Sequence, residues 1–97
     1  MNSYSKAIEA YPDHDYAYYY RGLAQFRLGN FKEAIVDLTS SIKLNPGDAS
    51  AYVNRGRAKF ASEDLQGALD DYSESIELDP NNAYAYYNRG VSKARWI

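Results

Sequence analysis

The sequence predicts an all-α protein in which antiparallel helix pairs repeat along the chain. The prolines give the first observation, because Pro12, Pro46 and Pro80 are equally spaced, each 34 positions after the one before. The second observation is that residues 15–48 and 49–82, aligned without gaps, are identical at twelve of 34 positions. The third is that apolar residues within each unit recur every three or four positions, which is the spacing of one helix face.

Each unit divides into two helices at a predicted turn. Residues 15–28 contain no proline and carry small and aromatic residues at helical spacing, and Gly29 and Asn30 then favour a tight turn. Residues 31–44 present one apolar face, and Pro46 ends this helix because proline disfavours the helical conformation in the residue before it. Applied to the whole chain, the pattern predicts helices near 2–11, 15–28, 31–44, 49–62, 65–78 and 83–96.

Glycines at equivalent positions predict where helices approach closely. Gly22, Gly56 and Gly90 each lie inside a predicted helix, where glycine costs about 1 kcal/mol relative to alanine. Helix axes come within about 8 Å of each other only where the side chains between them are small. We therefore expect a neighbouring helix to pack directly on these glycines.

Arginine and aspartate also recur at equivalent positions. Arg21 and Arg55 each precede one of these glycines, and Asp37 and Asp71 recur in the second helices of the two units. We expect the ion pairs Arg21–Asp37 and Arg55–Asp71, or equivalent pairs across the repeat boundary, which would specify the register of the helices. The alternative is that the arginines extend into solvent.

The recurring residues resemble the signature of the tetratricopeptide repeat, which spaces aromatic residues, a glycine, an alanine and a proline over a unit of the same length. The matching residues are Tyr18, Gly22, Ala34, Pro46, Tyr52, Gly56, Ala68, Tyr72 and Pro80. The chain departs from the signature where arginine replaces leucine before each glycine, and at Glu63, which replaces the turn glycine. The resemblance implies a right-handed α-solenoid and a single domain, 1–97. Its parts are the second helix of a partial repeat (1–14), repeats 15–48 and 49–82, and the first helix of a partial repeat (83–97).

The resemblance also implies a concave groove lined by the first helix of each pair, since each repeat buries its other faces against its neighbours. The groove face should be the stripe opposite the packing glycine and alanine. Tyrosine, with eleven copies in the chain, and arginine are enriched at binding hot spots, and asparagine can hydrogen-bond a peptide backbone. The predicted partner-binding residues are Tyr16, Tyr19, Leu23, Phe26, Arg27, Val53, Asn54, Arg57, Phe60, Tyr84, Tyr87, Asn88, Val91 and Arg95.

We therefore expect a protein–protein interaction scaffold that binds a peptide or a protein surface in this groove. The alternative for the tyrosines is that they pack only against their own neighbours. Two other functions stay open. One is self-association by end-to-end stacking of uncapped repeat faces, which would include Val91, Trp96 and Ile97. The other is a targeting role within a larger protein.

One function known in the family is not expected here. Some tetratricopeptide repeats hold the C-terminal carboxylates of heat-shock chaperones in a clamp of lysine, asparagine and arginine side chains. The corresponding positions of this chain hold Tyr19, Leu23, Asn54, Tyr84 and Asn88. Only Asn54 fits, so the sequence predicts that the chain is not a chaperone-tail clamp.

Composition argues against several other classes of function. The formal net charge is −2 and no basic stripe occurs, so nucleic acid is not an expected partner. No apolar run is long enough to span a membrane, and the lack of cysteine and of a signal peptide favours a cytoplasmic protein. His14 is the only histidine, and no nucleophile–base set or phosphate loop occurs, so we expect no metal, no cofactor and no enzymatic activity.

Overall fold

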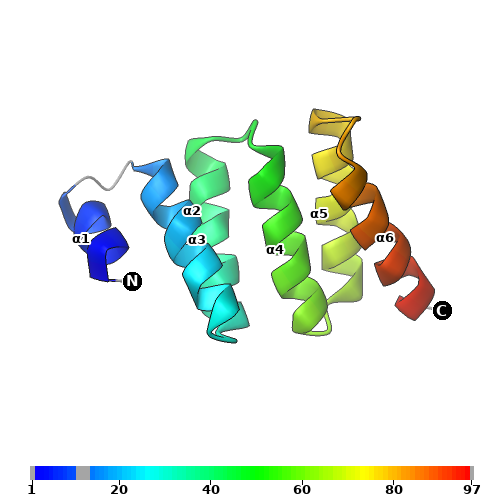
Figure 1. Ribbon diagram of the computed structural model, residues 1–97, viewed down its shortest axis with the longest axis horizontal. Helices are drawn as coiled ribbons and strands as arrows, with labels where there is room; N and C mark the ends of the chain where they lie inside the picture. Colours follow the sequence, from blue (N-terminus) through cyan, green and yellow to red (C-terminus); the bar gives the residue numbers. More distant parts are fainter. Residues whose placement is uncertain (1, 11–13, 97) are drawn as a thin grey trace.

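The computed structural model describes residues 2–10 and 14–96, and the side chains of residues 5–10 and 14–95. Within these residues the chain is helical and contains no strand (Figure 1). The predicted helices are confirmed, and each end that the structure describes lies within one residue of the prediction. The helices are α1 (Asn2–Ala10), α2 (Asp15–Arg27), α3 (Phe31–Leu44), α4 (Ala49–Ala61), α5 (Leu65–Leu78) and α6 (Ala83–Trp96).

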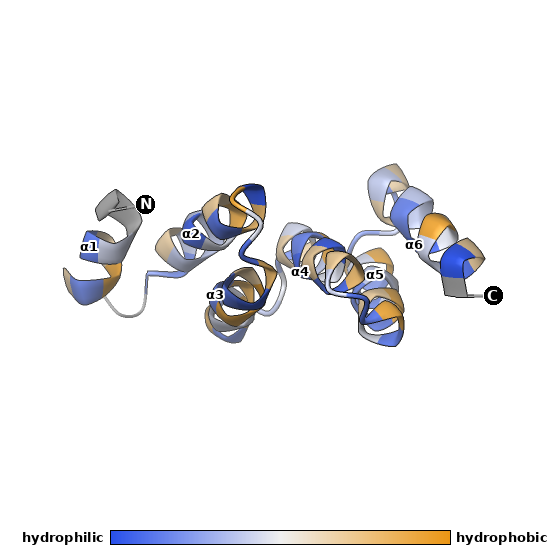
Figure 2. Cartoon of the chain, turned by 90° about the horizontal axis from the view of Figure 1, so that it is seen from below, coloured by the Kyte–Doolittle hydropathy of each residue, from blue (hydrophilic) through white to orange (hydrophobic). Residues whose placement is uncertain are grey.

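The helices stack in chain order into an elongated solenoid of 44 × 26 × 16 Å. Helix α2 packs antiparallel on α3, and α4 packs antiparallel on α5 (Figure 1). Helix α4 also contacts both α2 and α6, so these three helices form one layer, with α3 and α5 in the other (Figure 2). The first helices of the repeats therefore share one continuous surface.

Sequence signals at the helix ends explain where the helices begin and how they are joined. The Asp48 carboxylate caps α4 by accepting hydrogen bonds from the backbone N–H groups of Ser50 and Ala51, at 3.0 and 3.4 Å. The turns inside the two complete repeats pass through the left-handed region, at Gly29 (φ 83°) and at Glu63 (φ 70°). Glutamate carries a steric penalty in this conformation that glycine does not.

The close approach predicted at the glycines is confirmed for both complete repeats. A Cβ atom added to Gly22 would lie 2.9 Å from Leu38 Cγ, and one added to Gly56 would lie 2.7 Å from Tyr72 Cε1. Both neighbours are fully buried side chains, so the missing methyl group is what lets each helix pair close. At Gly90 no described heavy atom lies within 4 Å of such a Cβ.

The two predicted ion pairs are also confirmed, within each repeat rather than across its boundary. In both pairs the arginine Nε donates to the aspartate Oδ2 at 2.9 Å and Nη2 donates to Oδ1 at 2.7 Å. The carboxylates are almost fully buried, at 4% exposure for Asp37 and 3% for Asp71. The alternative of solvated side chains is therefore wrong for Arg21 and Arg55, and the hydrogen bond to aspartate raises the pKa of each guanidinium.

Candidate functional site

The structure places most of the predicted groove residues on the surface shared by α2, α4 and α6. Tyr16, Tyr84 and Tyr87 are more than half exposed, at 61, 51 and 70%. Val53 differs from the rest of the set, because it is only 3% exposed and packs in the core with Tyr72. The half-buried members are Tyr19, Leu23, Phe26, Asn54, Arg57, Phe60 and Asn88, and the other exposed members are Arg27, Val91 and Arg95.

Arg57 lies at the centre of this surface and links the three helices. Its guanidinium carbon is 4.9 Å from the centroid of the Phe26 ring on α2 and 5.6 Å from that of the Tyr84 ring on α6. Arg57 Nη1 also donates a hydrogen bond of 3.3 Å to Asn54 Oδ1. Cation–π contacts on two rings hold the side chain in place without neutralising its charge. Among the described residues, no carboxylate forms an ion pair with Arg57.

The amide of Asn54 is already used within the chain. Its Nδ2 donates to the Tyr19 hydroxyl at 3.0 Å and to the Ser50 carbonyl oxygen at 2.9 Å, while its Oδ1 accepts from Arg57. Both donors and the acceptor are thus occupied, so Asn54 positions Tyr19 and Arg57 in this structure. Burial is the main cause that raises the pKa of Tyr19, which keeps its hydroxyl protonated. Asn88 differs, since its Nδ2 donates to the Tyr84 carbonyl oxygen at 2.8 Å and its Oδ1 has no hydrogen bond within the described residues.

Three hollows follow one another along this surface, which we call the groove face. The first, of about 340 Å³, is lined by Tyr16, Tyr19, Tyr20, Asn45, Asp48 and Ser50. The second, of about 240 Å³, is lined by Tyr19, Ser50, Val53, Asn54, Asn82 and Tyr84. The third, of about 160 Å³, is lined by Phe26, Arg57, Phe60, Ala61, Tyr72, Asn88, Val91 and Ser92. Arg57 and Phe26 line the third hollow, and Tyr84, whose ring lies against Arg57, lines the second.

Two hydroxyl groups in the lining of the third hollow were not among the predicted site residues. Ser92 is 1% exposed and its Oγ makes no hydrogen bond of acceptable geometry with any described residue. The neighbouring Tyr72 is equally buried, and this burial raises its pKa to about 12 even though the positive charge of Arg57 acts to lower it. The sequence held a signal for Ser92, because the equivalent positions of the two complete repeats are Ala24 and Ala58.

The charge of the predicted groove residues differs in sign from that of the whole chain. The predicted groove residues include Arg27, Arg57 and Arg95 and no acidic residue. Arg95 is paired with Glu63 at 2.6 Å, but both side chains are largely exposed, so this pair is weak. Although the net charge of the chain is −2, the predicted groove residues carry positive charge and aromatic rings, and the carboxylate of Asp48 lines the first hollow, away from Arg57 in the third.

Features of other kinds of site are not found in the described part of the chain. His14 is exposed before α2, where its Nδ1 accepts a hydrogen bond of 3.3 Å from the Ala17 N–H. No group of three or more metal-ligating side chains comes together within residues 2–10 and 14–96. None of the helices described is both long and apolar enough to cross a membrane.

The fold and the groove face define a helical-repeat protein whose first helices line one surface. Comparison with protein families identifies residues 16–48 as a tetratricopeptide repeat and residues 56–95 as a TPR repeat. The chain belongs to the tetratricopeptide repeat family. A comparison with curated protein sequences gave no match.

Solved structures of tetratricopeptide repeat domains are closely similar. The first such domain of Spaghetti (RPAP3), bound to the HSP90 peptide SRMEEVD, has a TM-score of 0.95 and 33% identity over 98% of this chain and 75% of that one. The first domain of human RPAP3 has a TM-score of 0.92 and 33% identity, over 96% of this chain and 73% of that one. The second domain of human RPAP3, in complex with the HSP70 peptide SGPTIEEVD, has a TM-score of 0.90 and 26% identity, over 93% of this chain and 75% of that one.

Proposed function

We propose that the chain is a protein-interaction scaffold that binds an acidic peptide segment of a partner protein on the groove face. The observation that carries this proposal is the state of Arg57, a half-buried guanidinium that is held between two rings and has no carboxylate partner among the described residues. A positive charge fixed in place in this way has lost most of its freedom before the ligand arrives, so binding costs little further ordering.

The geometry around Arg57 suits a carboxylate. A guanidinium has five N–H donors, and among the described residues Arg57 donates one hydrogen bond, to Asn54. A carboxylate can accept two parallel hydrogen bonds from such a group, and a charge-assisted bond contributes about 1.5–3 kcal/mol. Phe26 and Phe60 line the adjoining hollow, which suits an apolar side chain next to the acidic one.

The similar structures support peptide binding but not an identical mode of binding. The peptides in two of them, SRMEEVD and SGPTIEEVD, each contain several acidic residues. In this chain Tyr19, Leu23 and Tyr84 occupy positions where a chaperone-tail clamp needs lysine or asparagine, and Tyr84 is stacked on Arg57. We therefore propose that this chain recognises acidic side chains along the peptide rather than the carboxylate at its end.

Selection from a library of displayed ten-residue peptides tests this function. The immobilised chain should enrich sequences with aspartate or glutamate beside an apolar residue, and the R57Q variant should not. The matched control is K43Q, which removes an exposed cation on α3, outside the predicted groove residues, and should enrich the same sequences as the parent chain. Amidating the C-terminus of an enriched peptide should change its affinity by less than about twofold. Enrichment of the same acidic sequences by R57Q, or no enrichment by any of the three proteins, would contradict the proposal.

A further inference from the structure

Three tyrosine rings of α2 gather around the first hollow of the groove face, which has a volume of about 340 Å³. The rings of Tyr16 and Tyr20 are stacked with their centroids 6.3 Å apart, and Tyr19 meets Tyr20 edge-on, at 5.2 Å and 85°. The face of such a ring attracts a cation that lies within about 6 Å of its centroid. The opposite side of the hollow is formed by the turn between α3 and α4, so both walls lie inside the described chain.

Asp48 brings a negative charge to this hollow. Its Oδ1 accepts both hydrogen bonds that cap α4, and its Oδ2 accepts none from any described residue. No described cation forms an ion pair with Asp48, and neither lysine nor arginine is among the residues that line the hollow. The charge of Asp48 is, after burial, the largest cause that raises the pKa of Tyr19, so it acts on a ring of the same hollow.

The charge of Asp48 is offset only in part by its own helix. The first N–H groups of a helix amount to about half a positive charge, and Asp48 lies directly before α4. A second carboxylate adjoins the hollow, because Asn45 of the lining donates from Nδ2 to Asp15 Oδ2 at 3.4 Å, and Asp15 begins α2. Two carboxylates and two helix N-termini leave about one net negative charge here. This end of the groove face therefore has the opposite charge to the end that holds Arg57.

The second hollow provides an internal comparison. The equivalent of Asp48 one repeat later is Asn82, which lines the second hollow and caps α6 by accepting from the Ala85 N–H at 3.2 Å. The equivalents of the three tyrosines are Ser50, Val53 and Asn54. Both hollows thus share the cap, whereas the carboxylate and the cluster of rings belong to the first alone. Capping the helix does not require the charge of Asp48.

We propose that the first hollow binds the side chain of a lysine in the peptide that the groove face holds, an inference that rests on the proposed function. Because Asp48 Oδ1 already accepts two backbone donors, Oδ2 is left for a single charge-assisted hydrogen bond. A compact ammonium suits one oxygen, whereas the planar guanidinium of arginine pairs best with two. The tyrosine rings pack against the aliphatic stem of the lysine and attract its charge.

The distance along α4 sets the spacing of charges in the peptide. Asp48 precedes Arg57 by nine positions, which corresponds to about 14 Å along a helix axis. An extended peptide covers about 3.3 Å per residue, so its lysine should lie about four positions from the acidic residue that meets Arg57. The peptide then carries opposite charges at the two ends of its bound segment, as the groove face does.

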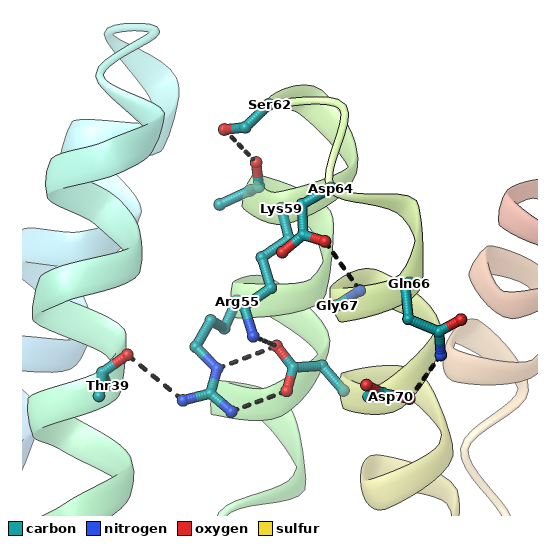
Figure 3. A network of polar contacts seen from close by, with 10 residues as sticks. Thr39, Arg55, Lys59, Ser62, Asp64, Gln66, Gly67 and Asp70 are labelled. Atoms are coloured by element: carbon teal, nitrogen blue, oxygen red, sulfur yellow. Dashed lines mark hydrogen bonds and ion pairs between the residues drawn. The ribbon is translucent and has the colours of Figure 1, made fainter.

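The variant D48N separates the charge from the cap, because asparagine caps a helix as well as aspartate does. Selection from displayed ten-residue peptides by the parent chain should enrich a lysine about three to five positions from an acidic residue. D48N should enrich the acidic residue without the lysine. The matched control is D64N: Asp64 caps α5 in the same way, accepting from the Gly67 N–H at 3.0 Å (Figure 3), but it lies at the other end of α4 (Figure 1). D64N should enrich the same sequences as the parent chain.

Calorimetric titration of one enriched peptide measures the contact itself. Norleucine in place of the lysine keeps the aliphatic stem and removes the charge. The norleucine version should bind the parent chain about tenfold more weakly, through loss of the charge-assisted hydrogen bond. D48N should bind the two versions equally, since the cycle of both changes isolates the pair formed by Asp48 and the lysine. Circular dichroism of D48N checks that the helices persist.

The possible failures point to different errors. Equal affinity of the parent chain for the lysine and norleucine versions would overturn the inference. A tenfold difference that persists in D48N would overturn it as well, because Asp48 would not be the partner of the lysine. Enrichment of acidic peptides with no preference for lysine would refute the lysine site and leave the proposed function intact. No enrichment of any peptide by the parent chain would refute the peptide binding on which both rest.

Discussion

The same substitution at two equivalent glycines should change stability in opposite directions. Alanine at either Gly56 or Gly90 improves helix propensity by about 1 kcal/mol. At Gly56 the new Cβ would lie 2.7, 3.0 and 3.1 Å from three atoms of the Tyr72 ring, which is fully buried and has no free space to move into. Overpacking of this kind costs about 1–3 kcal/mol. At Gly90 no described atom lies within 4 Å of the added Cβ, so only the gain in helix propensity remains.

We therefore expect G56A to destabilise the fold by up to about 2 kcal/mol and G90A to stabilise it by up to about 1 kcal/mol. Because the propensity gain is common to both, the difference between the variants measures the clash with Tyr72. For a domain of this size, 1 kcal/mol corresponds to a change in Tm of about 4–8 °C. Urea and thermal unfolding followed by circular dichroism measure both quantities. A G56A protein as stable as G90A would refute the close-contact explanation of the glycine.

Two further predictions concern Tyr72 and the Glu63 turn. Because burial raises the pKa of Tyr72 from 10.0 to about 12, the fold favours the neutral phenol. The stabilisation that this preference gives the folded state is complete below pH 10 and is lost as the pH rises to 12. The free energy of unfolding of the parent chain in urea should fall by about 2–3 kcal/mol over that interval. The fall should be clearly smaller for Y72F, and an equal fall in the two proteins would contradict the role given to Tyr72. E63G should raise the free energy of unfolding by about 0.5–1 kcal/mol, because glycine adopts a φ of 70° without strain and the ion pair lost to Arg95 is exposed. Lower stability of E63G than of the parent chain would show that this turn is not strained.

Repetition is the reason that the fold could be predicted from the sequence. A residue that recurs at an interval of 34 has the same environment in each copy, so Arg21 and Arg55 could be matched with aspartates before any coordinates were known. The helix ends followed from the recurring prolines and from the turn at Gly29 and Asn30, applied to each unit at the same interval. Side chains that differ between repeats carry no such information, and they make up most of the groove face.

The candidate site depended on packing that a single helix does not encode. Val53 was predicted on the groove face by its position in α4, and it lines the second hollow, but it is only 3% exposed because α4 has neighbours on both sides, α2 and α6. Asn54 was expected to be available to a peptide, yet Tyr19, 35 residues earlier, occupies its amide. The contact of Arg57 with rings from two other helices likewise depends on how α2, α4 and α6 pack together, which the sequence of α4 alone does not contain.

The two arginines Arg55 and Arg57 lie on one helix, but their side chains have different neighbours. Two residues correspond to a rotation of about 200° around a helix, so the side chains leave α4 on opposite sides. Arg55 faces α5 and meets Asp71, and the pair fixes the register of the two helices. Arg57 faces α2 and α6, which supply rings, and no carboxylate of the described residues forms an ion pair with it. The position of Asp71 on α5, and not a difference between the two arginines, decides that Arg55 is neutralised and Arg57 is not.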